Sequence, residues 1–363
     1  MILSKEIRVV QLIDSLEPGG AERMAVNLAN ELVNSVAFSG LVTTRLEGQL
    51  KNAIVADVNY LFLKRSRVVD FAALFRLRRY VRKNKITIIH AHGSSFFFAV
   101  LLKMLLPSLH VFWHDHFGNR SSNANSFFLL RFCSFFFKGV FTVNESLKIW
   151  AEQKLFCSQV KFIPNFSVSD PSPVGKTFLK GEPHKKIVFL ANLHQPKNHI
   201  LALKAFLESE IASKGWTLHL VGKDKEDAYS KELKIFIQEH AMQSHIYIYG
   251  SCDDISFVLQ QAKIGILVSS YEAFPLSLLE YGLAGLTVIC SDVGYCSAII
   301  QNDFSGRLIP PNDEMALKEA FIAISNQPEK NQIMAKNLNT FVQSTFTPEA
   351  VMPKICFSYQ KSI

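Results

Sequence analysis

The stretch Ser270–Glu280 reads SYEAFPLSLLE, and its two glutamates, Glu272 and Glu280, lie on either side of Pro275. The apolar run 264–268 predicts a buried strand before it, while Pro275 and leucines at helical spacing predict a helix after it. A polar loop therefore leads from a strand into a helix. Free N–H groups and the dipole at a helix start favour an anion, and carboxylates accept hydrogen bonds from hydroxyls. Phosphate and hydroxyl groups together indicate a nucleotide sugar as the ligand.

Residues 272–280 resemble the E-x7-E motif of the retaining GT-B glycosyltransferases of family four, also called glycosyl transferases group 1. The next run, 286–294, is similar to the strand and Asp-x-Gly turn that follow the motif in that family. The resemblance implies that Glu280 binds the ribose and that Glu272 contacts the donor sugar as a catalytic residue. It also assigns the intervening residues to donor binding: Phe274, Pro275, Leu276 and Ser277. Ala273 stands where the family usually has Gly, so the loop lacks the freedom of a positive φ.

A second motif, LEPGGAER at Leu16–Arg23, follows the first predicted strand and precedes a helix-like stretch. It is similar to the G-G-x-E-R motif of the same family. Paired glycines let backbone amides approach a phosphate closely, so the resemblance implies that Gly19 and Gly20 contact the donor diphosphate. On its residues alone, such a pair after a strand is more often a tight turn than a phosphate loop. The dinucleotide fingerprint G-x-G-x-x-G is absent from the sequence.

A third segment, ANLHQPKNH at 191–199, resembles the family segment that brings an Arg and a Lys to the nucleotide phosphates. Lys197 matches the lysine, and the resemblance assigns it to donor binding and catalysis. Asn192 or His194 stands where relatives have the arginine, and Asn192 is assigned to the donor site. A lysine neutralises a leaving diphosphate as a point charge, without the bidentate fork of Arg. A solvated loop lysine is the alternative interpretation of Lys197.

Histidines form two pairs, in IHAHG at 89–93 and in WHDHFG at 113–118, each at the end of a predicted strand. Alternate residues on a strand share a face, so each pair can point to one site. Structural histidines, a metal site and a ligand contact are the three interpretations. The family has a cleft histidine after each of these strands. The resemblance therefore implies site roles for the following residues: His92 as catalytic, and His114, Asp115 and His116 as acceptor contacts.

No metal-binding D-x-D motif is evident, since Asp253 and Asp254 begin a helix-like stretch where acidic residues are ordinary. The resemblance implies a retaining hexosyltransferase that needs no bound metal and no cofactor, because the nucleotide sugar is a substrate. Protein groups and a helix dipole would stabilise the departing diphosphate. No residue stands out as a covalent nucleophile. This favours a front-face reaction in which the leaving phosphate helps accept the proton of the acceptor.

Strand-like and helix-like runs alternate in two successive series, which predicts two parallel sheets with helices on both faces. We expect an N-terminal acceptor-side domain at 1–166, a linker rich in Ser, Pro and Gly at 167–184, and a nucleotide-sugar-binding domain at 185–347. By analogy with the family, the segment 348–363 would cross back to the first domain. The predicted fold is α/β of the GT-B type, with two doubly wound Rossmann-like domains facing across a cleft.

The chain of 363 residues is basic, with a net charge of +8 and a pI near 9.1, which favours an anionic partner. Its start leads straight into a predicted strand and leaves no room for a signal peptide, so we expect a cytoplasmic protein. The six cysteines form no C-x-x-C pair and indicate reduced core residues. The motifs favour a phosphorylated ligand, and not nucleic acid, as the anion.

The basic stretch 76–85 ends a predicted helix and is either a solvated helix end or a contact with anionic lipid. Two phenylalanine-rich runs, 96–102 and 127–137, are too short to cross a bilayer, which takes roughly 20 apolar residues. They are either buried helices against a sheet or segments that lie on the membrane beside the basic helix. The second interpretation would place the protein peripherally at the inner face of the cytoplasmic membrane.

The resemblance implies transfer of a sugar from a nucleotide-sugar donor, with UDP as the default nucleotide, to a bacterial surface glycan such as capsule or O-antigen. The acceptor would be a growing glycan or its lipid-linked form. One alternative is an NDP-sugar epimerase or glycogen-synthase-like enzyme of the same fold. The other is a sugar-nucleotide-binding subunit in which loss of the arginine has abolished turnover.

Overall fold

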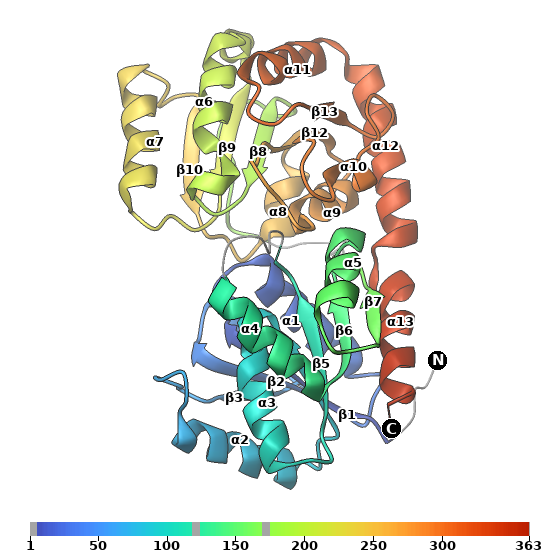
Figure 1. Ribbon diagram of the computed structural model, residues 1–363. Coiled ribbons are helices and arrows are strands. Elements are labelled where there is room, and N and C mark those ends of the chain that lie inside the picture. The colour runs from blue at the N-terminus through green and yellow to red at the C-terminus, as the bar shows by residue number, and fades with distance from the viewer. Residues whose placement is uncertain (1–5, 118–123, 169–174, 363) are drawn as a thin grey trace. The chain divides into compact units, whose positions relative to one another are not determined.

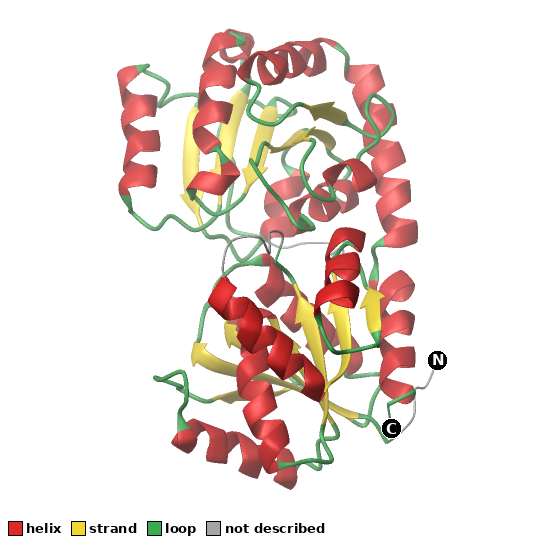
Figure 2. Cartoon of the chain, in the orientation of Figure 1, coloured by secondary structure: helices red, strands yellow, loops and turns green. Residues whose placement is uncertain are grey.

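The computed structural model describes residues 6–117, 124–168 and 175–362 (Figure 1). The chain divides into two compact units, an N-terminal unit of residues 1–166 with 348–363, and a C-terminal unit of residues 167–347. Each unit has one parallel sheet with helices on both of its faces (Figure 2). The prediction of two doubly wound α/β domains is therefore confirmed. Among the described residues, no helix combines the length and the apolar character that a membrane crossing requires.

The sheet of the N-terminal unit has the strand order β3-β2-β1-β4-β5-β6-β7, and its pairings are all parallel. The strands are β1 (Arg8–Ser15), β2 (Phe38–Leu46), β3 (Asn59–Phe62), β4 (Ile88–His92), β5 (His110–Asp115), β6 (Phe137–Thr142) and β7 (Val160–Phe162). After β1 the chain builds one side of the sheet, and from β4 onward it builds the other. The loops that follow β1 and β4 therefore part at the carboxyl edge between these neighbouring strands.

Helices cover both faces of this sheet because alternate residues of each strand point to opposite faces. Val10 and Leu12 of β1 belong to the core that packs against four helices, whereas Val9 belongs to the core on the other face. The first face carries α2 (Phe71–Lys83), α3 (Phe96–Leu105), α4 (Ala124–Cys133) and α5 (Glu145–Lys154), and the second carries α1 (Gly20–Leu32) and α13 (Pro348–Gln360). Short 3-10 helices connect some elements: η1 (Gln49–Ala53), η2 (Gly93–Ser95) and η3 (Ser134–Phe136).

The sheet of the C-terminal unit has the order β10-β9-β8-β11-β12-β13 and is also parallel throughout. Its strands are β8 (Lys186–Leu190), β9 (Thr217–Val221), β10 (Ile246–Gly250), β11 (Ile264–Leu267), β12 (Thr287–Ser291) and β13 (Arg307–Ile309). Its helices are η4 (Gln195–Lys197), α6 (His199–Glu208), η5 (Ile211–Lys214), α7 (Ala228–Glu239), α8 (Ile255–Gln260), α9 (Leu276–Leu283), α10 (Cys296–Ile299), α11 (Glu314–Asn326) and α12 (Pro328–Thr345). Here the chain changes sides between β8 and β11.

A buried tyrosine of α9 fixes the carboxyl ends of β8 and β11. The hydroxyl of Tyr281 accepts a hydrogen bond from the N–H of Leu190 at 2.7 Å and donates to the carbonyl of Ile266 at 3.0 Å. Its ring lies against Gly265, where a built Cβ would come within 2.6 Å of the ring. Glycine in β11 therefore lets α9 approach the sheet closely, and Tyr281 holds the end of the strand that leads into the predicted phosphate loop.

We expect Tyr281→Phe to lower the free energy of unfolding by about 1–3 kcal/mol, because the buried N–H of Leu190 would lose its acceptor. Urea denaturation of the purified chain measures this change. Tyr247→Phe is the matched control, because its hydroxyl bonds a backbone carbonyl in an exposed setting. Equal stability of the two variants would contradict the role assigned to Tyr281.

Candidate functional site

In the C-terminal unit, the loops after β8 and β11 hold an ion pair between two predicted catalytic residues. Nζ of Lys197, the last residue of η4, lies 2.5 Å from Oε1 of Glu272. The hydroxyl of Ser269 donates to the same carboxylate oxygen at 2.7 Å. The side chains of Lys197 and Glu272 are 23% and 9% exposed, so the pair is shielded but open at one edge. Because β8 and β11 are neighbours, two loops distant in sequence bring a cation and a carboxylate together.

Backbone contacts fix the path of these loops. The N–H of Ser270 donates to the carbonyl of Pro196 at 2.9 Å. Gly294, in the Asp-x-Gly turn, has a φ of +56°, and a Cβ built on it would lie 1.7 Å from the carbonyl oxygen of Glu272. Only Gly fits this position without moving the Glu272 loop. Ala273 is not among the residues with a positive φ, so Ala replaces the usual Gly of the family without backbone strain.

Helix α9 begins directly after this loop, and within the described part of the chain no side chain caps its start. Phe274, Pro275 and Leu276 are buried, so their backbone groups, and not their side chains, are available to a ligand. Ser277 and Glu280 are partly exposed and lie three residues apart on one face of the helix. The predicted donor residues thus divide into a buried set that shapes the loop and two polar side chains that reach the surface.

Asn192 and His194 occupy the place of the missing arginine. The amide oxygen of Asn192 accepts a hydrogen bond from the backbone N–H of Lys223 at 2.9 Å, which ties the loop after β8 to the loop after β9. Burial and the charges of Lys197 and Lys225 lower the pKa of His194, so this ring is mainly neutral near pH 7. A neutral histidine with two lysines nearby therefore stands at the place where the family resemblance predicts an arginine.

In the N-terminal unit, Gly19 precedes α1 and Gly20 is its first residue. The side chain of Glu22 folds over Gly19, since a Cβ built on Gly19 would lie 2.3 Å from Oε2 of Glu22. Burial, with the nearby charge of Asp14, raises the pKa of Glu22. A diphosphate that approached Gly19 would meet this carboxyl group. Glu22 must therefore turn away or carry a proton for the predicted phosphate contact to form.

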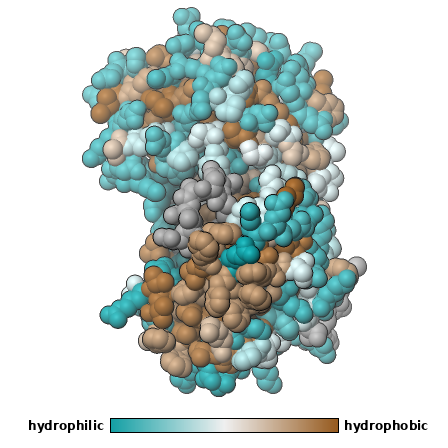
Figure 3. Space-filling model, in the orientation of Figure 1, coloured by the Kyte–Doolittle hydropathy of each residue, from teal (hydrophilic) through white to brown (hydrophobic). Residues whose placement is uncertain are grey.

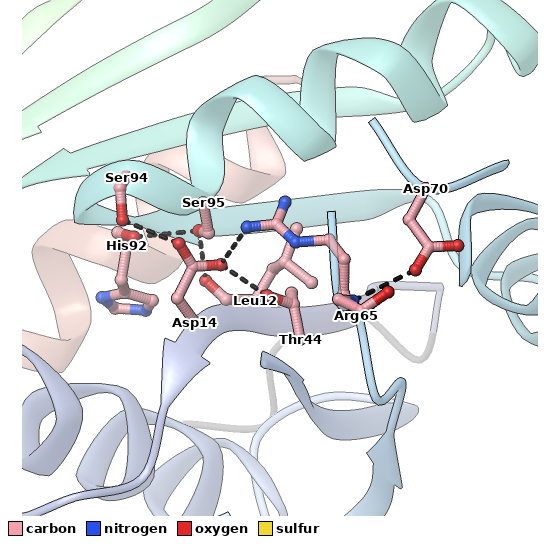
Figure 4. Close-up of polar contacts among 9 residues, drawn as sticks. Leu12, Asp14, Thr44, Arg65, Asp70, His92, Ser94 and Ser95 are labelled. Carbon is pink, nitrogen blue, oxygen red and sulfur yellow. Dashed lines mark hydrogen bonds and ion pairs between the residues drawn. The ribbon is translucent and has the colours of Figure 1, made fainter. Parts of the chain in front are cut away.

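A polar network that sequence analysis missed lies at the carboxyl edge of the same sheet (Figure 4). Asp14 of β1 accepts hydrogen bonds from the hydroxyls of Thr44 and Ser94 and pairs with Arg65 at 3.0 Å. The guanidinium of Arg65 lies over the ring of Phe98, 4.8 Å from its centre. The network joins β1, β2, η2 and the segment after β3. Its signal in the sequence is an acidic residue near the end of an apolar strand.

Four histidines form a stack at the carboxyl ends of β4 and β5: His90, His92, His114 and His116. The rings of His90 and His92 lie 10° apart with their centres at 4.6 Å, and those of His114 and His116 lie 30° apart at 4.2 Å. Nitrogen atoms of the first three lie within 4.8 Å of one another. However, a metal ligand offers its lone pair in the plane of the ring, and stacked planes do not converge on one ion. The geometry favours a hydrogen-bonded stack over a metal site.

One row of hydrogen bonds in the stack leads outward from Gln11. Nε2 of His92 lies 2.9 Å from the amide oxygen of Gln11, and Nδ1 of His92 lies 3.0 Å from Nε2 of His116. In this orientation of the Gln11 amide, whose own Nε2 has no partner among the described residues, His92 carries its proton on Nε2 and accepts from His116 on Nδ1. This leaves Nδ1 of His116 as a buried acceptor with no partner among the described residues.

The other row begins on α13. The hydroxyl of Tyr359 bonds Nδ1 of His90, and Nε2 of His90 lies 3.2 Å from Nδ1 of His114. Nε2 of His114 is buried and has no partner within the described ranges. The structure therefore brings the predicted pairs His90/His92 and His114/His116 together, and it adds Gln11 and Tyr359, which sequence reasoning did not connect to them.

Two aspartates that the sequence singled out accept hydrogen bonds from backbone N–H groups. Asp115, a predicted acceptor contact, is fully buried, and its carboxylate accepts from the N–H of Phe117 at 3.0 Å. Asp254, weighed as part of a metal motif, accepts from the N–H groups of Lys176 and Thr177. Asp115 thus stabilises its own segment of backbone, whereas Asp254, at the start of α8, anchors a segment that lies 77 and 78 residues earlier in the chain.

Two family models match the chain. Residues 18–166 match the model described as Glycosyltransferase Family 4, and residues 176–340 match the model described as Glycosyl transferases group 1. The two matched ranges cover the N-terminal and the C-terminal unit in turn, and the second contains the Lys197–Glu272 pair and α9.

Several curated relatives match at low identity. The chain is 22% identical over 341 residues to the GalNAc-α-(1→4)-GalNAc-α-(1→3)-diNAcBac-PP-undecaprenol α-1,4-N-acetyl-D-galactosaminyltransferase of Campylobacter jejuni, covering 91% of this chain and 92% of that one. Its match to an exopolysaccharide phosphotransferase of Streptomyces coelicolor is 30% identical but spans 49% of this chain and 18% of the relative. A match to an Escherichia coli UDP-Gal:α-D-GlcNAc-diphosphoundecaprenol α-1,3-galactosyltransferase, 28% identical, spans 29% and 27%.

Solved structures share the fold. Anabaena HepE in complex with UDP and glucose superposes with a TM-score of 0.84 at 15% identity, covering 98% of this chain and all of that one. TarM superposes with a TM-score of 0.79 at 11% identity, covering 98% and 99%. At these identities the likeness concerns the fold, which is that of the GT-B glycosyltransferases.

We expect the free energy of unfolding to fall as the pH drops below about 6.5, because burial lowers the pKa of His90, His92 and His114 well below their usual value and that of His116 to about 3. The unfolded chain would bind protons that the folded chain excludes. Each such histidine contributes a slope of up to about 1.4 kcal/mol per pH unit between its unfolded and folded pKa. Urea denaturation from pH 7.5 to 5.0 measures the slope, and His116→Gln should make it shallower. An unchanged slope in that variant would contradict a neutral, buried ring.

Proposed function

The chain belongs to the GT-B glycosyltransferases of group 1, and from this we propose that it transfers a hexose from a UDP-sugar to the lipid-linked form of a growing bacterial surface glycan, an O-antigen or capsule. The observation that carries the proposal is the contact of Lys197 with Glu272 beside the start of α9. A phosphate-binding cation, a helix start and hydroxyl-binding carboxylates meet at the edge where parallel sheets bind ligands.

In the proposed donor complex, Lys197 and the N–H groups at the start of α9 bind the diphosphate. Glu280, one turn into α9 and partly exposed, accepts hydrogen bonds from the ribose hydroxyls. Glu272 binds hydroxyls of the donor sugar. Lys197 and Glu272 contact each other, and in the proposed complex this contact is exchanged for two charge-assisted contacts with the donor.

The proposed reaction retains the configuration at the anomeric carbon and uses neither metal nor cofactor. The bond from the anomeric carbon to the β-phosphate oxygen breaks, and the acceptor oxygen bonds to the same face. The proton of the acceptor hydroxyl passes to the departing phosphate oxygen. Lys197 stabilises the charge that develops on UDP. Lys225, whose charge acts on His194, supplies a second cation near the position of the missing arginine.

For the acceptor, we assign the neutral histidine stack. Nδ1 of His116 is a buried acceptor without a partner in the described structure, and it suits a sugar hydroxyl as donor. The names of two relatives support a lipid-linked acceptor, since both act on sugars attached to diphosphoundecaprenol. We therefore propose that the protein works in the cytoplasm, at the inner face of the cytoplasmic membrane.

One alternative function has a specific observation in its favour. The missing arginine, replaced by Asn192 and a neutral His194, favours a subunit that binds nucleotide sugars without turning them over. The other alternative is an epimerase of the same fold, which would bind a nucleotide sugar at the same site. All three functions predict UDP binding, and they differ in what happens to the donor.

The test is incubation of the purified chain with UDP-glucose, UDP-galactose, UDP-GlcNAc and UDP-GalNAc, with and without bacterial undecaprenyl-diphosphate-linked sugars. We expect slow UDP release, accelerated by an acceptor, and an α-linked product by NMR. Lys197→Ala should reduce release severely, while Lys231→Ala, an exposed lysine of α7, should not. Thermal protection by UDP-sugars without release would identify a binding subunit, and interconverted UDP-sugars would identify an epimerase. Release that is insensitive to Lys197→Ala would reject the site.

We expect Glu280→Gln to weaken UDP binding by about 1–3 kcal/mol, roughly 5- to 150-fold, because a neutral amide accepts weaker hydrogen bonds from the ribose. Isothermal titration with UDP measures the loss. Glu319→Gln, an exposed glutamate of α11, is the matched control and should bind as the unmodified chain does. If a folded Glu280→Gln variant binds UDP with unchanged affinity, Glu280 is not the ribose ligand.

A further inference from the structure

Helices α2, α3 and α4 pack side by side on one face of the N-terminal sheet, and their outward sides carry large apolar groups. On α4, Phe128 and Phe132 are 68% and 61% exposed, whereas Leu130 and Cys133 of the same helix are buried in the core. Phe135, in η3, is 67% exposed. Figure 3 shows a broad hydrophobic area over this part of the N-terminal unit.

The exposed area continues onto the neighbouring elements. Phe71 and Phe75 lie four residues apart on the outer side of α2 and are 67% and 55% exposed. Met104, near the end of α3, is also exposed. The ring of Phe156 lies 4.4 Å from that of Phe135, so apolar contact extends past the end of α5. We call the outer sides of α2, α3 and α4, with Phe135 and Phe156, the aromatic face.

The two phenylalanine-rich runs therefore differ. In the run 96–102, Phe98, Val100 and Leu102 are buried, and the interpretation as a core helix is correct. In the run 127–137, the core takes up Leu130, Cys133, Ser134 and Phe137, whereas Phe128, Phe132 and Phe135 are exposed. Monomeric surfaces rarely expose contiguous apolar patches of this kind without a partner.

Charge distinguishes the kind of partner. The stretch 71–144 contains ten Lys and Arg residues and a single acidic residue, Asp115, which is fully buried. Its net charge is therefore +9, against +8 for the whole chain, so the remainder of the protein is nearly neutral. Arg79, Arg82 and Lys83 are exposed on α2, and the guanidinium of Arg131 lies over the ring of Phe156.

We propose that the aromatic face is a docking surface for an anionic phospholipid bilayer. Exposed aromatic side chains insert at the boundary of headgroups and acyl chains, and Lys and Arg around them are attracted to anionic headgroups. A protein partner would have to tolerate ten cations with no accessible carboxylate in the same stretch. This docking surface is inferred from exposure and charge, and only its biological role rests on the proposed function. That role is to hold the chain where a lipid-linked acceptor lies.

The two kinds of side chain make separate contributions to binding. Attraction between the cations and anionic lipid is screened by salt, because the Debye length shrinks from about 10 Å at 0.1 M to about 3 Å at 1 M. Insertion of the aromatic side chains is not screened. Binding should therefore begin with lipid charge and, once the rings are inserted, retain a part that resists salt.

The experiment is flotation of the purified full chain with vesicles of phosphatidylcholine alone or with 30% phosphatidylglycerol, at 50 mM and 500 mM NaCl. The aromatic variant is Phe128→Ser with Phe132→Ser, and its control is Phe304→Ser with Ile333→Ser, which are equally exposed in the C-terminal unit. The charge variant is Arg79→Ser with Arg82→Ser and Lys83→Ser. Its control is Lys231→Ser with Lys336→Ser. Thermal melting and UDP titration verify that each variant is folded.

We expect the unmodified chain to float with anionic and not with neutral vesicles at low salt. The charge variant should bind at least tenfold more weakly, and the aromatic variant should lose the fraction that stays bound at high salt. Both controls should bind as the unmodified chain does. Absence of binding, binding that ignores lipid charge, or variants that bind normally would overturn the proposal. A dimer by light scattering that the aromatic variant converts to a monomer would identify a protein interface instead.

Failure of this proposal is distinguishable from failure of the proposed function. Sugar transfer to a water-soluble acceptor analogue by a chain that does not bind vesicles would reject the docking surface alone. If the chain binds vesicles but neither releases UDP nor transfers sugar, the proposed function is rejected and the proposed docking surface is supported. The variants of the aromatic face should leave UDP affinity unchanged, because none of the substituted residues is among those assigned to donor binding.

Discussion

In each unit the chain builds one side of a parallel sheet, then returns to the middle and builds the other side. This reversal forces two loops apart at the carboxyl edge, between β1 and β4 in one unit and between β8 and β11 in the other. The Lys197–Glu272 pair and the network around Asp14 lie at these two places, and the histidine stack lies beside the first, at the ends of β4 and β5. Gly265 and Gly294 have their roles for the same reason, since backbone, ring and loop must approach one another closely where the strands end.

The sequence predicted the central strands well, because buried parallel strands are short apolar runs between turn residues. It did not predict β3 or β13, which are short edge strands with a polar residue among few apolar ones. The family resemblance placed Lys197 and Glu272 in one site. In contrast, no local pattern could pair Asp14 with Arg65 or His90 with Tyr359, which come together only through the order of the strands. Nor could periodicity tell the inner from the outer side of a helix as apolar as α4.

The two units use charge in different ways. In the C-terminal unit, lysines lie at the edge where the sheet ends, beside a carboxylate that balances one of them. In the N-terminal unit, burial keeps the histidines at the corresponding edge neutral, and the cation Arg65 at that edge is paired with Asp14, while other cations lie on the outer helices. The lysines at the edge of the C-terminal sheet suit the negative charge of a diphosphate. The neutral histidines at the edge of the N-terminal sheet suit hydroxyl groups as hydrogen-bond partners.

The position of α13 constrains the order in which the chain can fold. Tyr359, Val351 and Ile355 complete a core whose other members, such as Val9 and Met24, are translated before the whole C-terminal unit. At about 5–20 residues per second, a ribosome needs roughly 10–40 s to make residues 167–347. During that time, α1 covers one face of the first sheet without α13, and the hydroxyl that bonds His90 is missing. The C-terminal unit, which is continuous in sequence, can finish folding before α13 completes the core of the N-terminal unit.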